Sequence, residues 1–487
     1  MNHVKNQLLN ALSPFWLISL SIVFGLTLPI LIQDAMFQDA MLYSSVSHNL
    51  SMGIGTFWFL QYSTLNLEGI PSFHEQPPLV FGIQSIFYKL LGHSYYVERF
   101  YTLLMIVFHI LLINYLWKII LRNKVEYKSF GWLPVFLWII IPVCFWSFRN
   151  NMIENTVSVF TLISVILSYK SIQLKEPNYL GWFGSGFFIF LASFSKGIPG
   201  FFPITFPFIY WLVNRDISFK KCIYYSMILI AVPAIIYVIL LYFPESRRSL
   251  MIYFYERLIK RVNHMPTANY RWEILWRLFT EMIPILIIVT ITIFASGKNK
   301  LKDYLSENKK LAVLFFCIGM SGSVPLTLTM VQKGWYMVPS FPYFALSFAL
   351  LIVPFIYKPI SKWSMQSYNY KTFVFVSLLV FVSVLIFSGM QKGKISREQD
   401  IVTDVYKVGS VVPRFSTITV PLEMYDQYDF ILQGFLVRYF NISISPYQQY
   451  RYYLKEKDIN SEVPNIYRKV DMGLINYDLF VQDSVPR

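Results

Sequence analysis

The sequence predicts a polytopic α-helical membrane protein with a small α/β domain at its C-terminal end. Of the 487 residues, 55% are hydrophobic and only 14% are charged, and the mean hydropathy is +0.48. A soluble domain carries roughly 25% charged residues, so this composition excludes most soluble classes of protein. About eleven segments are long and apolar enough to cross the hydrocarbon core of a bilayer. By contrast, the residues after 389 have an ordinary polar composition.

The predicted spans make up a membrane module over residues 1–389. The first apolar segment starts too late and runs too long for a simple signal peptide, so we expect a retained helix. The approximate spans are 14–32, 96–121, 131–148, 152–169, 180–195, 197–213, 220–242, 281–296, 311–331, 337–357 and 371–389.

The distribution of Lys and Arg predicts the orientation of these spans. Alternate loops, beginning with the N-terminus, are rich in basic residues, whereas residues 33–78 contain none. We therefore expect a protein of the plasma (inner) membrane whose N-terminus is cytoplasmic. Its loops at 33–95 and 243–280 and its domain at 390–487 are expected on the extracytoplasmic side. The net charge of +15 is then mainly a signal of topology, and the expected partner is the lipid bilayer and not nucleic acid.

The loop at 243–280 breaks this charge rule because it is basic on the predicted outer side. Such a cluster indicates that an anion is held there, with a phosphate group as the leading candidate. Arg257 and Arg261 are four residues apart and would share one face of a helix, with Lys260 beside them. The alternative is contact with anionic lipid headgroups.

The C-terminal domain, at 390–487, is expected to alternate strands and helices. Alternating residues predict a strand at 416–420, and an amphipathic run predicts a helix over 426–440. A short strand at 442–445, a helix near 447–457 and a strand near 474–481 follow.

The positions of the ionisable residues favour a reaction at the membrane surface over a permeation path. Charges inside spans usually mark ion or proton pathways, but here they lie at or beyond the span ends on the predicted outer side. We find no internal repeat of the kind that builds secondary transporters. The apolar run Leu79 to Leu91 is too short to span and is expected to lie in the interface or to pack over the site.

Five short patterns follow one another along the predicted outer side. They are Gln38-Asp39-Ala40-Met41-Leu42-Tyr43, Phe73-His74-Glu75-Gln76-Pro77-Pro78-Leu79, Arg149 to Glu154, Phe194-Ser195-Lys196-Gly197-Ile198-Pro199-Gly200, and Lys333-Gly334-Trp335-Tyr336-Met337-Val338-Pro339.

In this order the patterns resemble motifs of the GT-C superfamily of glycosyltransferases, which use lipid-phosphate sugars. The nearest branches are the protein O-mannosyltransferases and the aminoarabinose transferase of lipid A. Two positions depart from the family pattern: Ala40 stands where many members have a second acidic residue, and Gln76 replaces a usual lysine. The exposed C-terminal domain also resembles that of some members.

The resemblance implies roles for individual residues. Asp39 would be the base that activates the acceptor, and Glu75 would be a supporting carboxylate. The residues that would contact the donor phosphate or sugar are Tyr43, Arg149, Glu154, Lys196, Arg257, Lys260, Arg261, His264, Lys333 and Tyr336.

Structural alternatives remain open for several of these residues. Asp39 could instead be a helix cap at the exit of the first span, as could Asp34, which no motif supports. Glu154 could form a structural ion pair with Arg149, and His264 could be an ordinary structural histidine.

The implied function is that of an integral-membrane glycosyltransferase. It would move a sugar from a polyprenyl phosphate to a lipid, polysaccharide or protein acceptor on the extracytoplasmic face. Two other classes stay open: a flippase or exporter of a lipid-linked saccharide, and a polymerase or ligase acting on diphosphate-linked glycans. The six histidines and three cysteines form no metal-binding spacing, so we predict no cofactor, although a divalent metal is possible in this superfamily.

Overall fold

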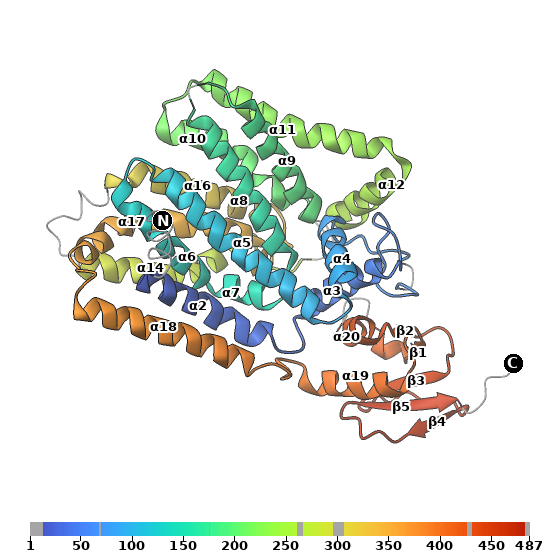
Figure 1. Cartoon of the computed structure of the whole chain (residues 1–487). Coiled ribbons are helices and arrows are strands. Elements are labelled where there is room, and N and C mark those ends of the chain that lie inside the picture. The colour runs from blue at the N-terminus through green and yellow to red at the C-terminus, as the bar shows by residue number, and fades with distance from the viewer. Residues whose placement is uncertain are drawn as a thin grey trace. The chain divides into compact units, whose positions relative to one another are not determined.

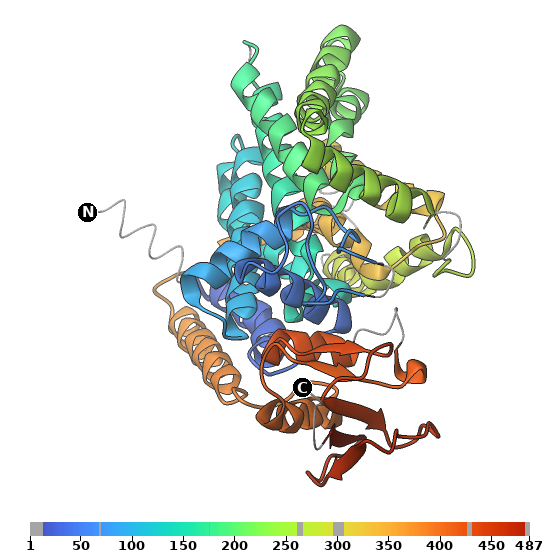
Figure 2. The ribbon, with the colours of Figure 1, turned by 90° about the vertical axis from the view of Figure 1, so that its right-hand side faces the viewer.

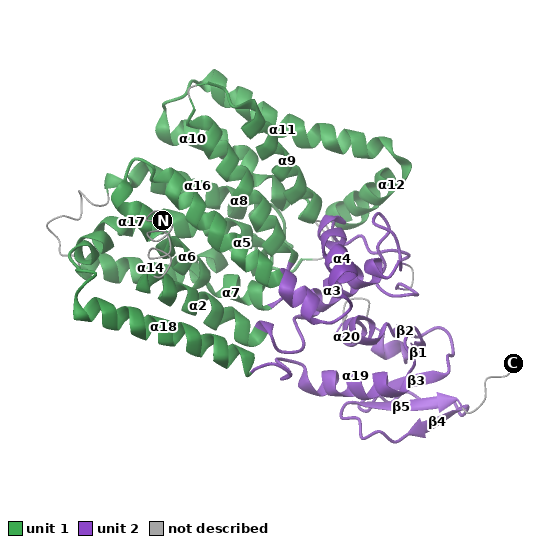
Figure 3. Ribbon diagram, in the orientation of Figure 1, with its two compact units in different colours: residues 1–30, 102–149, 153–390 green, residues 31–101, 150–152, 391–487 purple. Residues whose placement is uncertain are grey.

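The chain forms two compact units, each built from separate stretches of sequence (Figure 3). The computed structural model describes residues 13–67, 70–174, 176–260, 266–295, 306–425 and 431–482. Unit 1 comprises Met1–Ile30, Thr102–Arg149 and Ile153–Met390. Unit 2 comprises Leu31–Tyr101, Asn150–Met152 and Gln391–Arg487.

Unit 1 is helical throughout its described part (Figure 1). Helix α2 ends with one residue, Leu31, in unit 2, and helix α5 begins in unit 2 and enters unit 1 at Thr102. The elements are α2 (Pro14–Leu31), α5 (Tyr96–Ile120), η1 (Val125–Phe130), α6 (Trp132–Ile139), α7 (Pro142–Arg149), α8 (Ile153–Ile172), α9 (Tyr179–Lys196), η2 (Ile198–Thr205), α10 (Phe206–Asn214), α11 (Phe219–Tyr242), α12 (Pro244–Ile252), the π-helical turn η3 (Tyr253–Ile259), α14 (Glu273–Ala295), α16 (Lys309–Ser323), η5 (Val324–Leu328), η6 (Gly334–Ser340), α17 (Phe341–Ser361) and α18 (Tyr368–Gly389).

The described helices confirm a multi-pass membrane protein. Eight of them are long and apolar enough to cross a membrane, or nine if Val125–Ile139 and Pro142–Arg149, which meet at 82°, form one bent span. The predicted spans at 180–195 and 197–213 are also helical, but the second is a shorter helix, Ile198–Asn214, that starts as a 3₁₀ turn. The count of eleven therefore stays a prediction.

Helices α8 and α17 form the interior of unit 1, and α18 lies at its outer surface. In the most apolar stretch of α8, and of the helix from η6 through α17, 78% of the residues are buried, against 11% in α18. Helix α9 packs on α8 through small residues: Ser185 Oγ lies 2.8 Å from Ser164 Oγ and 2.7 Å from Ser168 Oγ. Small polar residues allow this close approach between helices in a membrane.

Helices α2 and α18 run parallel. Phe15 contacts Phe373 near the start of both helices, and Phe24 contacts Phe381 further along, with ring centroids 5.4 and 6.1 Å apart. Both helices therefore end on the same side of unit 1, where the chain passes into unit 2 at Leu31 and Gln391.

Unit 2 combines two helices of the first loop with a C-terminal sheet domain, which is orange to red in Figures 1 and 2. The sheet has the strand order β2-β1-β3-β5-β4. Strand β1 pairs in parallel with β2 and β3, whereas β5 pairs antiparallel with β3 and β4. The elements are α3 (Gln38–Ser51), α4 (Leu79–Leu91), α19 (Gln399–Val411), β1 (Thr417–Thr419), η7 (Leu422–Met424), α20 (Ile431–Phe440), β2 (Ser443–Ser445), β3 (Tyr452–Glu456), β4 (Tyr467–Val470) and β5 (Tyr477–Gln482).

The structure confirms three of the predicted C-terminal elements and corrects one. Strands β1, β2 and β5 lie where strands are predicted, at 416–420, at 442–445 and near 474–481. The helix predicted near 447–457 is wrong, because this segment contains strand β3. Since β3 lies between β1 and β5, three consecutive residues of it, Tyr452 to Leu454, are buried, and the alternation that marks a strand is lost. Helix α20 confirms the later part of the predicted helix at 426–440, and residues 426–430 lie outside the described residues.

A buried ion pair joins the start of α5 to α20 within unit 2. Both carboxylate oxygens of Glu98 accept hydrogen bonds from Arg438, from Nε at 3.1 Å and from Nη2 at 2.7 Å. The Tyr88 hydroxyl of α4 donates to Glu98 Oε2 at 2.8 Å, and Arg99 Nη1 lies 3.4 Å from Oε1. This network ties the first loop to the C-terminal domain.

Asp34 makes a second connection of the same kind, and not the helix cap considered for it. Its carboxylate accepts hydrogen bonds from the hydroxyls of Tyr406, at 2.6 Å, and Tyr439. Burial, followed by the hydrogen bond to Asp34, raises the pKa of Tyr406, which keeps this hydroxyl protonated and able to donate. Helix α2 ends at Leu31, and helix α3 starts only at Gln38 with Phe37 at its N-cap position, so Asp34 lies between the two helices.

Candidate functional site

In unit 1, the predicted residues Glu154 and Lys196 form a buried ion pair. Glu154 lies in the first turn of α8 and Lys196 is the last residue of α9, and the two residues are 0% and 6% exposed. Lys196 Nζ lies 2.5 Å from Glu154 Oε1. Among the described residues, Glu154 Oε2 has no hydrogen-bond partner. Half of this buried carboxylate is therefore open to a further donor.

Tyr336 completes the surroundings of the lysine. It lies in η6, and Lys196 Nζ is 4.4 Å from the centroid of its ring. Residues from the third, fourth and fifth sequence patterns thus meet in unit 1. An ammonium group has three N–H donors, so one bond to Glu154 and one contact with the ring face leave one donor for an anionic oxygen.

The turn after Lys196 requires glycine. Gly197 has φ +78° and ψ −139°, a region in which L-residues are strained. A Cβ atom at Gly197 would come within 2.2 Å of the Tyr253 hydroxyl, which donates to Lys196 O at 3.4 Å. The backbone around Lys196 is therefore held by Tyr253 of the η3 turn, a contact that sequence reasoning did not predict.

Lys333 is placed close to two tryptophans. Its Nζ lies 5.8 Å from the centroid of the Trp335 ring, which stacks on Trp146 at 5.2 Å. Lys333 is the N-cap residue of η6, the turn that carries Tyr336. No carboxylate pairs with Lys333 among the residues that the structure describes, so its charge is available to an anion.

Arg149 does not pair with Glu154 in this structure. Its Nε donates to Leu26 O at 2.6 Å, and its guanidinium lies 4.7 Å from the centroid of the Phe145 ring. The carboxylate of Glu154 is bound by Lys196 instead, so the ion pair considered as a structural alternative is replaced by one between helices α8 and α9.

Two residues near this cluster were missed as site residues. Glu281, inside α14, accepts a hydrogen bond from the Val143 N–H at the start of α7, at 2.7 Å. Arg277 lies 3.9 Å from Glu281 Oε1, and its guanidinium packs so closely on Gly334 that a Cβ there would come within 2.1 Å of Arg277 Nε. These contacts fix the entry to η6. The sequence signal that could have identified Glu281 is its position, as an acidic residue at the start of the predicted span 281–296.

The basic cluster of the loop 243–280 is only partly described. Arg257 lies in η3 and is half-buried, and Lys260 follows it on the surface, paired with Glu256. Arg261 and His264 lie outside the described residues. The roles of these four residues stay predictions.

In unit 2, Asp39 lies in the first turn of α3 and is half-buried. Tyr43, one turn later, is 5% exposed and packs edge-on against Phe73 and Phe81, with ring centroids 6.4 and 5.8 Å away. This aromatic cluster joins α3 to the segment that carries Glu75 and to α4.

Glu75 is half-buried and accepts a hydrogen bond from the Tyr62 hydroxyl at 2.8 Å. A tyrosine hydroxyl that donates to a carboxylate fixes its orientation without neutralising its charge. The two carboxylates predicted for acid–base work, Asp39 and Glu75, thus both belong to unit 2.

The segment at 150–152 orients α3 and α4. Asn150 Oδ1 accepts from the Phe37 N–H at 2.8 Å, directly before α3. Asn151 and Gln84 exchange two amide hydrogen bonds, of 3.0 and 2.9 Å, and Asn151 Nδ2 also lies 3.1 Å from Ser44 Oγ. Sequence reasoning missed these amides, which buttress the helix that carries Asp39.

Metal-ligating residues do not gather in the part of the chain that the structure describes. No group of three or more His, Cys, Asp or Glu side chains lies there in an arrangement that could hold an ion.

The chain is thus a multi-pass membrane protein with two distinguishing features. Its helical unit contains a buried Lys–Glu pair at helix ends, and its C-terminal end contains a mixed sheet. A family model described as dolichyl-phosphate-mannose-protein mannosyltransferase matches residues 75–241. This stretch begins at Glu75 and includes Arg149, Glu154 and Lys196, and it leaves Asp39 and Lys333 outside.

Two solved structures share the fold over nearly the whole chain. ArnT from Cupriavidus metallidurans bound to undecaprenyl phosphate has a TM-score of 0.62 and 11% identity, and the match covers 96% of this chain and 97% of that one. The same protein in the apo state also gives a TM-score of 0.62 and 11% identity, over 99% and 98% of the chains. Compared by sequence with curated proteins, the chain has no significant match.

The chain therefore has the fold of a GT-C membrane glycosyltransferase. The predicted fold class and the predicted resemblance are both confirmed. At 11% identity the likeness concerns the fold, and the roles of single residues depend on the geometry described above.

Proposed function

We propose that the protein transfers a sugar from a polyprenyl phosphate to an acceptor hydroxyl at the extracytoplasmic face of the membrane. The observation that carries the proposal is the Lys196–Glu154 pair, buried at helix ends and still able to bind both an anionic oxygen and a donor group. Buried ion pairs are costly in membranes and are commonly kept for function. The ligand of the matching ArnT structure, undecaprenyl phosphate, supports this class of donor.

Lys196 is assigned to the phosphate of the donor. Its remaining N–H would bind a phosphate oxygen, and Lys333 would add a second positive charge as the phosphate leaves. The unpartnered Oε2 of Glu154 would accept a hydrogen bond from a sugar hydroxyl or amine. Arg149, Arg257, Lys260, Arg261, His264 and Tyr336 remain supporting candidates for donor contacts.

Asp39 is assigned as the base. The acceptor oxygen attacks the anomeric carbon of the sugar, the bond from that carbon to the phosphate oxygen breaks, and polyprenyl phosphate leaves with the electron pair. The acceptor proton passes to the Asp39 carboxylate, which acts as the general base. Glu75 would support this charge balance, and Tyr43 would line the donor side.

The assignment of the base is tested by Asp39→Asn. Mass spectra of lipid, polysaccharide and protein fractions from cells with the wild-type chain should show a product heavier by one sugar, and this product should be absent with the variant. Asp400→Asn is the matched control, because Asp400 is an exposed aspartate in the first turn of another helix of unit 2, α19. Near-normal product from Asp39→Asn would remove the base from the mechanism.

The donor half is tested by binding of undecaprenyl phosphate to the purified chain. Lys196→Ala should weaken binding by about tenfold or more, whereas Lys371→Ala, an exposed lysine in the first turn of α18, should leave it unchanged. Unchanged affinity in Lys196→Ala would contradict the phosphate assignment. Movement of a lipid-linked sugar across liposomes without covalent transfer would identify a flippase instead.

A further inference from the structure

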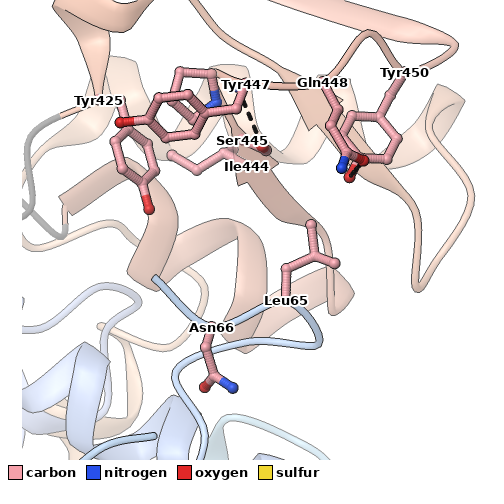
Figure 4. A pocket seen from close by; sticks show the side chains of 9 residues that line it. Leu65, Asn66, Tyr425, Ile444, Ser445, Tyr447, Gln448 and Tyr450 are labelled. Atoms are coloured by element: carbon pink, nitrogen blue, oxygen red, sulfur yellow. Dashed lines mark hydrogen bonds between the residues drawn. The ribbon is translucent and has the colours of Figure 1, made fainter. Parts of the chain in front are cut away.

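Unit 2 contains a pocket that the proposed chemistry does not use. It has a volume of about 160 Å³ and lies between the first loop and the C-terminal domain (Figure 4). Tyr425 and Tyr447 stand together at one end, Gln448 and Tyr450 at the other, and Asn66 faces them from the first loop.

The position of the pocket is one at which open α/β sheets bind ligands. Strands β1 and β2 are parallel, and the pocket lies beyond the carboxyl end of β2, at Ser445 and the residues that follow it. In such sheets the crevice outside the carboxyl ends of the strands is the usual binding position, because the connecting loops converge there.

The wall of the pocket is built by hydrogen bonds within the domain. Thr419 Oγ1 donates to Gln448 O at 3.0 Å and accepts from the Tyr450 N–H at 2.8 Å. The Tyr450 hydroxyl donates to Gln448 Oε1 at 2.8 Å. The side-chain amide of Gln448 is thereby oriented, and its nitrogen has no hydrogen-bond partner among the described residues. An amide nitrogen with two N–H donors is thus presented to the pocket.

The residues around the pocket define the chemistry of its ligand. None of the lining side chains is charged, so a phosphate, a carboxylate or an amine would find no counter-ion there. The rings of Tyr425 and Tyr447 meet at 75° with centroids 6.2 Å apart, and Tyr447 is 56% exposed. The negative face of an exposed tyrosine ring attracts the weakly positive C–H groups of a ligand.

A neutral sugar ring has the matching groups. One face presents C–H bonds to an aromatic ring, and the rim presents hydroxyls to an amide and to tyrosine hydroxyls. The volume corresponds to about five water molecules, which is room for one six-membered ring. An extended peptide would add to the outermost strand β2, but Pro446, directly after Ser445, has no N–H to continue the pairing.

We propose that this pocket binds a neutral sugar unit of the acceptor, so that the acceptor is a glycan or a glycolipid. The inference rests on the proposed function, because it assigns the pocket to the molecule that receives the transferred sugar. The pocket is distinct from the donor groups of unit 1 and from Asp39 and Glu75, and it contributes affinity and orientation only.

The experiment measures saccharide binding to the full chain in lipid nanodiscs by saturation-transfer NMR. The probes are the methyl glycosides of glucose, mannose, galactose and N-acetylglucosamine. We expect saturation transfer to ring C–H protons of at least one probe, with affinity reduced about tenfold in Tyr447→Ala and less in Gln448→Ala. Tyr447→Phe keeps the ring face and should bind within about twofold of the wild type.

Ile466→Ala is the matched control, because Ile466 is 45% exposed in the same domain and does not line the pocket. Absence of transfer to all four glycosides, or equal affinity in wild type and Tyr447→Ala, would overturn the proposal. Binding of neutral tripeptides in place of the glycosides would overturn the assigned ligand class.

Undecaprenyl phosphate binding, measured on the same samples, separates this inference from the proposed function. The pocket variants should keep the lipid affinity of the wild type. A wild-type chain that binds glycosides but not undecaprenyl phosphate would contradict the proposed function and leave the saccharide site standing. Loss of both ligands in Tyr447→Ala would indicate a damaged fold. The milder variant Gln448→Ala would then decide whether the pocket binds glycosides, by its glycoside affinity at unchanged lipid affinity.

Discussion

Unit 1 and unit 2 each bury a carboxylate against a cation, but they use its oxygens differently. In unit 2, both oxygens of Glu98 are bound, by Arg438, Tyr88 and Arg99. In unit 1, only Oε1 of Glu154 is bound, by Lys196, and Oε2 has no partner among the described residues.

The difference separates a structural pair from a functional one. A buried charge whose hydrogen bonds are all made within the protein has nothing left to offer a ligand, whereas a half-satisfied group stores a desolvation cost that a ligand can recover. The saturated pair around Glu98 joins two parts of unit 2, and the open pair around Glu154 awaits a substrate. Four substitutions test this reading.

The largest effect is expected for Glu98→Gln. A glutamine has one acceptor oxygen, so its amide N–H groups would face an N–H donor of Arg438, and the guanidinium, which cannot lose its proton, would stay buried without its counter-ion. We expect a loss of about 3 to 5 kcal/mol in the free energy of unfolding, measured by denaturant titration or by protease susceptibility of unit 2.

An exposed ion pair of the same domain provides the control for Glu98→Gln. Lys469 lies 2.8 Å from Asp478 at the surface, so Asp478→Asn should change stability by less than about 1 kcal/mol. Equal effects of Glu98→Gln and Asp478→Asn would remove the distinction between a saturated buried pair and an ordinary one.

The same substitution in unit 1, Glu154→Gln, should affect activity more than stability. The glutamine oxygen can take the place of Oε1 and its amide nitrogen the place of the unpartnered Oε2, so no two donors face each other. We expect transfer to fall about a hundredfold, because the carboxylate no longer balances Lys196 or accepts from the sugar, with a stability loss of about 1 to 2 kcal/mol. Transfer and unfolding measured on one preparation decide this, and a stability loss as large as that of Glu98→Gln would contradict an open site.

The sequence was sufficient to choose the members of the open pair but not to pair them. Local motifs pointed to Glu154 and Lys196, yet the only ion pair considered for Glu154 was one with Arg149. The actual partner is on the next helix, α9, and this contact depends on how closely α8 and α9 pack through their serines. The periodicity of a helix predicts which of its residues share a face, but not which other helix that face contacts.

The saturated pair left even less trace in the sequence. Glu98 and Arg438 come from the start of α5 and from α20, and each looks like an ordinary charge near the end of an apolar segment. The misread strand β3 has the same origin, since its contacts with distant segments of unit 2 decide which of its residues are buried. The missed helix α19 differs, because its buried residues Val402, Val405 and Val408 follow a local helical period that the sequence does contain. Membrane spans were predictable because contact with lipid requires a long apolar run, and half-buried strands were predictable because their residues alternate between two faces.

A third substitution, Gly197→Ala, tests whether the open pair depends on the turn that follows Lys196. The backbone angles at Gly197 strain an L-residue, and the new methyl group would displace the Tyr253 hydroxyl, so we expect a cost of about 1 to 3 kcal/mol and weaker binding of undecaprenyl phosphate. Gly389→Ala is the matched control, because no atom lies within 4 Å of its Cβ position. If both variants bind the lipid like the wild type, the turn does not position Lys196.

The smallest effect concerns a histidine beside the saturated pair. His48 of α3 is 3% exposed, neither of its ring nitrogens has a hydrogen-bond partner among the described residues, and its ring lies 5.3 Å from that of Tyr88. Burial, followed by the positive charges of Arg438, His93 and Arg414, lowers the pKa of His48 from 6.5 to about 2.

The sign of the pH dependence follows from this depressed pKa. Below about pH 6.5 the unfolded chain takes up a proton that folded His48 refuses, so its contribution to stability is complete above that pH and is lost progressively as the pH falls toward 2. As the pH falls from about 7.5 to 5.5, the free energy of unfolding of the wild type should decrease by about 1 kcal/mol more than that of His48→Phe. Because phenylalanine cannot titrate, the difference between the two proteins removes the contribution of the carboxylates, which both share. Parallel stability curves for the two proteins would mean that His48 accepts a proton in the folded state, and hence that the surroundings of Arg438 are less closed than the saturated pair requires.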